Sequence, residues 1–298
     1  MSTRFSPRSR GVFSPILAGY LLRFHFARCV PRLFLWIAAL CCFGAETGTA
    51  QQLQFSYRLK RVDLQSQDPW PDHWLTWLDY NAEAVIAYNA NYIGAPTDPN
   101  FRFQIYYASN SDEYQMLTGE AGSVGVTINS VEGDGLRRSK VFFYNQDLEK
   151  ADGGWRWKAS GDSFCTVLHE MCHAIHFSGS KQDSFGKLPM PFQEGLCDYI
   201  AEQYWYVSIP KKRDRTKRLD TILKLIDDGK LPSLNIFFQT KDYADWDLLF
   251  DGNRVLGYIY GMFLAEFFLD DPKRAAIFTT LMKPLRGIGP TQERKGIL

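Results

Sequence analysis

The sequence has no long hydrophobic run beyond its first fifty residues, almost no net charge and few cysteines. Each shortage excludes a class of protein. No later segment reaches eighteen consecutive apolar residues, so no transmembrane helix is expected there. The formal net charge is +1 over 298 residues, so no overall basic field favours binding to nucleic acid. Apolar residues make up 45% of the chain, which excludes a disordered protein.

The six cysteines fall into two groups of three. Three lie in the first fifty residues, and the rest of the chain keeps Cys165, Cys172 and Cys197. This odd and sparse set argues against a disulfide scaffold. One bridge between Cys172 and Cys197 is left open, beside the alternative of three small buried residues.

The N-terminal fifty residues carry the positive charge that the remainder lacks. They hold six Arg and one acidic residue, whereas residues 51–298 hold 28 basic and 32 acidic side chains. An apolar run over 33–45 follows Arg32 and precedes the small residues 48–50, which is the three-part pattern of a secretory signal peptide. We expect cleavage after Ala50 and export to the periplasm, the cell surface or the medium. An uncleaved anchor or a buried helix is the alternative.

Residues 51–298 are expected to form a single α+β domain, because strand patterns come first and helical patterns follow. The expected strands cover 101–107, 124–128 and 140–144. The expected helices cover 71–92, 111–118, 162–177, 191–206, 216–228 and 254–269. Residues 145–161 are polar and Gly-rich, which predicts a loop.

Residues 169–173 read H-E-M-C-H, an H-E-x-x-H pattern inside the helix expected over 162–177. On an α-helix, His169 and His173 project from the same face one turn apart, so both imidazoles can reach one zinc ion. Glu170 then points to the open side of the metal, where it can act as a general base. The alternative is two histidines that merely lie on a polar helix face.

A zinc hydrolase needs a third protein ligand and one open position for water. A metzincin has a histidine where this chain has Gly179, which excludes that class. His176 would continue the ridge of the same helix, so it is expected beside a ligand or at the surface. Glu194 begins the next expected helix, and an antiparallel arrangement would bring its carboxylate to the metal from another direction.

Asp198 follows Glu194 by four residues, so the two carboxylates face the same way. A carboxylate at this position can accept a hydrogen bond from a ligand imidazole, which we expect to be that of His169. Taken alone, Asp198 would be read as a solvated acid on a helix face. The combination of H-E-x-x-H with E-x-x-x-D is more specific than either half.

Residues 169–173 and 194–199 together resemble the gluzincins, the thermolysin-like zinc peptidases of the peptidase MA clan. The wider stretch over about 100–270 resembles a bacterial peptidase-MA-like family. The resemblance implies a small mixed sheet whose edge strand lines the cleft, packed on the two ligand helices, with further helices at the C-terminus. It also implies a role for each motif residue: zinc ligands His169, His173 and Glu194, general base Glu170, and Asp198 beside the ligands.

These observations predict an exported zinc-dependent metallopeptidase that hydrolyses peptide or protein substrates. Tyr258 or Tyr243 could assist the oxyanion, although aromatic core packing is the alternative for Tyr258. A catalytically silent zinc-binding domain is the second interpretation, and the intact Glu170 argues against it. A surface module that recognises polysaccharide is the third, and only Trp155 and Trp157 favour it locally. The sequence leaves the oligomeric state and the cleaved peptide open.

Overall fold

The computed structural model describes most of the chain after residue 52. The described ranges are 53–92, 100–133, 135, 137–144, 146, 148–151, 154–157, 162–178, 188–208 and 215–282. The expected leader, residues 1–50, and its cleavage position after Ala50 lie outside the described residues, and so do the side chains of Trp155 and Trp157.

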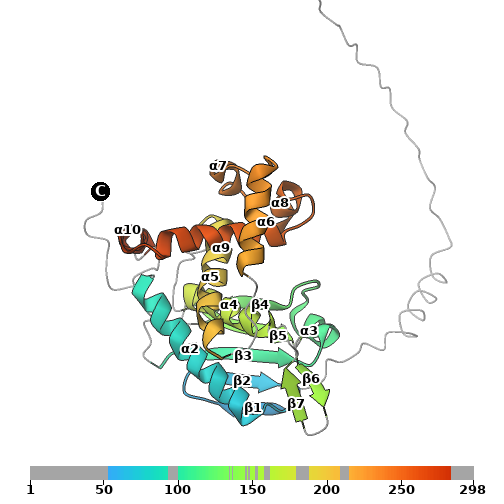
Figure 1. Ribbon diagram of the computed structural model, residues 1–298. Coiled ribbons are helices and arrows are strands. Elements are labelled where there is room, and N and C mark those ends of the chain that lie inside the picture. The colour runs from blue at the N-terminus through green and yellow to red at the C-terminus, as the bar shows by residue number, and fades with distance from the viewer. Residues whose placement is uncertain are drawn as a thin grey trace, which may run out of the picture. The chain divides into compact units, whose positions relative to one another are not determined.

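Five strands form one mixed sheet in the order β1-β2-β3-β5-β4. Their bounds are Phe55–Arg58 (β1), Val62–Ser66 (β2), Phe103–Ala108 (β3), Gly125–Val131 (β4) and Arg137–Tyr144 (β5). Strands β2, β3 and β5 run parallel, whereas β1 and β4 pair antiparallel at the two edges (Figure 1). The expected α+β fold with a small mixed sheet is therefore confirmed. Two of its strands come from before residue 100, so the sheet extends beyond the stretch expected to form the core.

Alternation along the central strands decides which side chains enter the core. Phe103, Ile105 and Tyr107 of β3 are almost fully buried, and so are Val141 and Phe143 of β5. Successive side chains of a strand point to opposite faces, so these residues line one face of the sheet. The period-two pattern that predicted β3 thus builds the apolar floor on which the helices pack.

Nine helices lie in the described part of the chain, and six of them begin and end within two residues of the expected positions. Their bounds are Asp72–Tyr92 (α2), Ser111–Thr118 (α3), Asp162–Phe177 (α4), Met190–Ser208 (α5), Arg215–Asp227 (α6), Leu234–Phe237 (α7), Tyr243–Leu249 (α8), Val255–Leu269 (α9) and Pro272–Met282 (α10). None of these described helices combines the length and apolar character that a membrane span requires.

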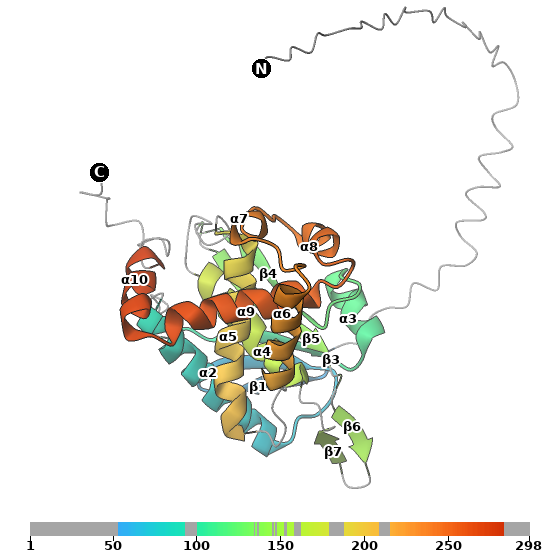
Figure 2. The ribbon, with the colours of Figure 1, turned by 45° about the horizontal axis from the view of Figure 1, so that its top comes forward.

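The helices stack in layers above the sheet (Figure 2). Helix α4 packs on β4 and β5, α5 packs on α4 and α2, and α9 packs on α5. Helix α4 is buried on nearly all sides, with Leu168, Met171 and Ile175 fully enclosed. A helix buried all round has few positions for polar groups, so those that it does carry need partners inside the protein.

Helices α5 and α9 approach each other at a crossing of two glycines. A Cβ added to Gly195 would lie 2.2 Å from the backbone carbonyl of Gly261. A Cβ added to Gly261 would lie 2.7 Å from the carbonyl oxygen of Pro191. Only glycine therefore permits this distance between the two helices, and the crossing lies directly beside Glu194.

The segment 145–161 is not only a loop, as expected, but contains a second small sheet. Strands β6 (Leu148–Ala151) and β7 (Gly154–Trp157) pair antiparallel there. The polar composition of the segment concealed the strands. The Asp-Gly dipeptide at 152–153 is a hairpin signal in the sequence that could have revealed them.

Candidate metal centre

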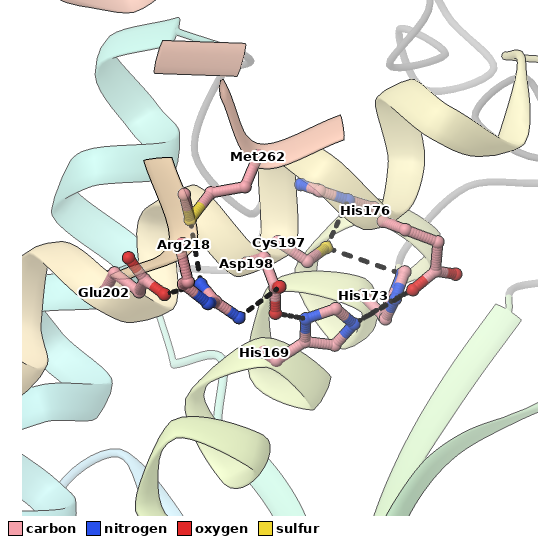
Figure 3. Close-up of polar contacts among 9 residues, drawn as sticks. His169, His173, His176, Cys197, Asp198, Glu202, Arg218 and Met262 are labelled. Atoms are coloured by element: carbon pink, nitrogen blue, oxygen red, sulfur yellow. Dashed lines mark hydrogen bonds and ion pairs between the residues drawn. The ribbon is translucent and has the colours of Figure 1, made fainter. Parts of the chain in front are cut away.

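Two neighbouring helices supply the polar groups of the centre (Figure 3). Helix α4 carries His169 and His173, four residues apart, and α5 carries Glu194 and Asp198 at the same spacing. This spacing places each pair on one face of its helix. All four side chains are buried where the two helices pack together.

Three of these side chains converge through one atom each. His169 Nε2 lies 3.1 Å from His173 Nε2. Glu194 Oε2 lies 3.1 Å from His169 Nε2 and 3.4 Å from His173 Nε2. The three atoms thus form a nearly equilateral triangle, with two corners from α4 and one from α5.

Asp198 contacts the far side of the first imidazole. Its Oδ1 lies 2.9 Å from His169 Nδ1, which is the contact that the helical spacing predicts. Burial by itself would lower the pKa of His169, but hydrogen bonds with Asp198 and Glu194 outweigh it and hold that pKa well above its usual value. Burial would raise the pKa of Glu194, yet the two histidines hold it well below its usual value.

Cys197 joins the same cluster, a position that was not predicted from the sequence. Its Sγ lies 3.5 Å from His173 Nδ1, and together His169, His173 and Cys197 form a buried group that could hold a metal ion. The signal was present in the sequence, because Cys197 lies three residues after Glu194 on the same helix. Burial, followed by the neighbouring Cys172 thiol, raises the pKa of the Cys197 thiol well above its usual value.

The three cysteines of the described chain are buried thiols and form no disulfide there. The structure therefore has the three small buried residues, and not the bridge between Cys172 and Cys197 that the sequence left open. His176 is also buried, with its Nε2 3.0 Å from Asn89 Oδ1 and its Nδ1 3.7 Å from Cys197 Sγ. His176 is therefore not a surface residue, and neither of these two contacts is with one of the three converging atoms.

Glu170 faces the edge strand β4. The hydroxyl of Thr127 lies 2.8 Å from Glu170 Oε2, to which it can donate, and 2.9 Å from the Glu170 carbonyl oxygen. A Cβ at Gly125 would lie 2.6 Å from the side chain of Thr166, so glycine allows β4 to lie this close to α4. Thr127 was not predicted, because nothing in its local sequence distinguishes it from an ordinary strand residue.

Two tyrosines lie beside the centre. The ring of Tyr258 packs edge-on to His169 with centroids 6.1 Å apart, and it stacks on Tyr243 at 5.9 Å. Burial and then the negative charge of Glu194 raise the pKa of both tyrosines, so both hydroxyls keep their protons. Tyr258 also meets Trp246 edge-on at 5.1 Å, so it belongs to an aromatic cluster as well as lining the centre.

The structure brings four of the residues predicted from the sequence into one buried cluster, and Tyr258 adjoins it: His169, His173, Glu194 and Asp198. Glu170, on the same helix as the two histidines, is buried beside Thr127 of β4. No protein-family model and no curated protein matches the chain.

Proposed function

We propose that this protein is an exported zinc-dependent peptidase in which Glu170 is the general base. The observation that carries the proposal is the convergence of His169 Nε2, His173 Nε2 and Glu194 Oε2 within 3.4 Å of one another. Export rests on the leader pattern of residues 1–50 alone.

The donor set fits zinc. Two imidazole nitrogens and one carboxylate oxygen are a common set for catalytic zinc, which leaves the fourth position open. Ligand atoms on a tetrahedral zinc ion lie about 3.3 Å apart, given bonds of about 2.0–2.1 Å. The observed separations of 3.1, 3.1 and 3.4 Å bracket that spacing.

The contacts behind the two imidazoles favour Glu194 over Cys197 as the third ligand. Asp198 engages His169 at Nδ1, and Cys197 engages His173 at Nδ1, so both rings keep Nε2 for a metal. Groups that hold the second nitrogen of a ligand imidazole fix its orientation and tautomer. Since Cys197 lies on the Nδ1 side of His173, it is better suited to this supporting role than to coordination.

The reaction that these residues suit is hydrolysis of a peptide bond. When bound, zinc would polarise the scissile carbonyl and lower the pKa of a water molecule. Glu170 accepts a proton from that water as the water oxygen bonds to the carbonyl carbon. It then gives the proton to the amine nitrogen as the carbon–nitrogen bond breaks. Tyr258, or Tyr243 beside it, could donate a hydrogen bond to the oxyanion.

The edge strand supports an extended peptide as the substrate. Strand β4 ends the five-stranded sheet, and it lies beside the helix that carries Glu170. An extended peptide can add to such an edge through backbone hydrogen bonds, which would bring its carbonyl groups near Glu170. A mixed sheet with an antiparallel edge strand next to the motif helix agrees with the gluzincin resemblance.

The test is cleavage of a broad peptide library by the purified protein, beside Glu170→Gln. We expect the variant to keep about one zinc per chain yet lose at least about a hundredfold in activity, the scale of general-base removal. Glu266→Gln on α9 is the matched control, because Glu266 pairs with Arg215 and not with the centre.

Three outcomes separate the interpretations. Loss of activity in Glu170→Gln alone supports the peptidase. Zinc without any cleavage by the unsubstituted protein would favour a silent zinc-binding domain. Near-normal turnover by Glu170→Gln would remove Glu170 as the base.

A further inference from the structure

Helix α5 carries a row of three buried acids. Glu194, Asp198 and Glu202 are spaced four residues apart, so they follow one face of the helix at intervals of one turn. All three are at most 8% exposed. Buried carboxylates are costly unless they are paired, so a row of three needs cations as well as histidines.

Arg218 of α6 places a positive charge beside this row, at the end that is farther from the histidines (Figure 3). Its side chain is only 15% exposed, and its Nη2 lies 3.7 Å from Asp198 Oδ2. Its Nη1 forms an ion pair with Glu202 and lies 3.0 Å from Met262 Sδ on α9. The two arms of one guanidinium therefore reach two successive acids of the row.

Asp198 is held from both sides. Its Oδ1 faces His169 Nδ1, while its Oδ2 faces Arg218. A carboxylate with a fixed partner on each oxygen cannot turn without losing one of them. Loss of Arg218 would leave Asp198 and Glu202 as neighbouring buried negative charges and would release the orientation of Asp198.

We propose that Arg218 is a positioning residue for the metal centre, acting on His169 through Asp198. This inference rests on the proposed function, because it requires His169 to be a metal ligand. The planar fork of arginine is essential to it, since a lysine ammonium is a single point charge that cannot span two carboxylates in the same way.

The experiment compares zinc affinity and the visible absorption spectrum of the cobalt(II)-substituted protein in Arg218→Met and the unsubstituted chain. Loss of a group that supports a ligand histidine typically weakens metal binding 10–100-fold. We expect a loss of that size in Arg218→Met together with an altered cobalt spectrum. Arg218→Lys should recover part of the affinity but not the spectrum.

Arg215→Met is the matched control, because Arg215 lies one turn earlier on α6 and pairs with Glu266 of α9. It should leave zinc affinity and the cobalt spectrum unchanged. Equal losses in Arg215→Met and Arg218→Met would overturn the inference, because they would trace the effect to the packing of α6.

Unchanged metal binding in Arg218→Met would also overturn it while leaving the proposed function intact. Absence of zinc binding by the unsubstituted protein would instead refute the proposed function, and the inference with it. If Arg218→Met does not fold, Arg218→Lys decides, and an unaltered cobalt spectrum in that variant overturns the inference.

Discussion

The candidate metal centre between α4 and α5 and the aromatic cluster around Phe237 are both buried, but they are built from different interactions. Buried polar and charged groups fill the centre. Large apolar side chains fill the Phe237 cluster: Ile222, Phe237, Trp246, Phe250, Ile259 and Tyr260. The ring of Phe237 stacks on Tyr260 with centroids 4.5 Å apart, and Trp246 donates its indole N–H to Thr240 at 2.9 Å.

We infer from this difference that the candidate centre serves metal binding, whereas the Phe237 cluster serves the stability of the fold. Burying His169, Glu194 and Asp198 costs desolvation free energy, which their mutual contacts offset, so a charged cluster of this kind stabilises the fold less than apolar packing does. The Phe237 cluster gains free energy from apolar burial and fixes the helices around the centre. Tyr258 lies between the two regions, since it contacts both His169 and Trp246.

The most severe test of this comparison is His173→Ala. We expect it to abolish zinc binding, because two remaining ligands hold zinc poorly. Metal analysis of the purified variant checks this, with thermal unfolding to show that the apo protein still folds. His73→Ala, an exposed histidine on α2, is the matched control and should retain full zinc. Full zinc in His173→Ala would exclude the proposed site.

Phe237→Ala should have the opposite effect to His173→Ala, lowering the stability of the fold while leaving zinc binding intact. Phe237 is fully buried, so truncation to alanine should lower the free energy of unfolding by about 3–5 kcal/mol. Urea unfolding measures this, and zinc affinity measured on the folded variant should remain unchanged. A large loss of affinity in folded Phe237→Ala would show that the two regions are not separable.

Asp198→Ala should have the smallest effect of the three. Removing the partner of His169 Nδ1 should weaken zinc binding 10–100-fold without abolishing it, unlike loss of a ligand. A chelator competition assay measures the affinity. Asp63→Ala on β2, whose carboxylate pairs with Arg102, serves as the control. An unchanged affinity in Asp198→Ala would contradict the role assigned to this contact.

Much of the fold was predictable because long amphipathic helices and alternating strands repeat their signal over many residues. Helices α4 and α5 are therefore close to their expected bounds. Strands β1, β2, β6 and β7 were missed, since four or five residues give too little pattern to recognise. Helices α7 and α8, of four and seven residues, were missed for the same reason, and α10 was missed despite its eleven residues.

The residues of the candidate site divide in the same way, into those that a repeated sequence pattern predicts and those that it does not. Spacing within one helix brought out His169, His173 and Asp198, because periodicity fixes which residues share a face. Thr127 and Arg218 reach the site from other elements, and their contacts depend on how β4 and α6 pack. Periodicity within one helix or strand contains no information about such packing.

The glycine crossing of α5 and α9 has a mechanical consequence for the centre. Gly195 directly follows Glu194 and lies against the backbone of Gly261. Helices α5 and α9 are therefore in close contact beside Glu194, the third corner of the triangle formed with His169 and His173. The backbone contact leaves no room at this corner for either helix to move toward the other. Amide hydrogens around Gly195 should accordingly be among the slowest in the molecule to exchange with solvent.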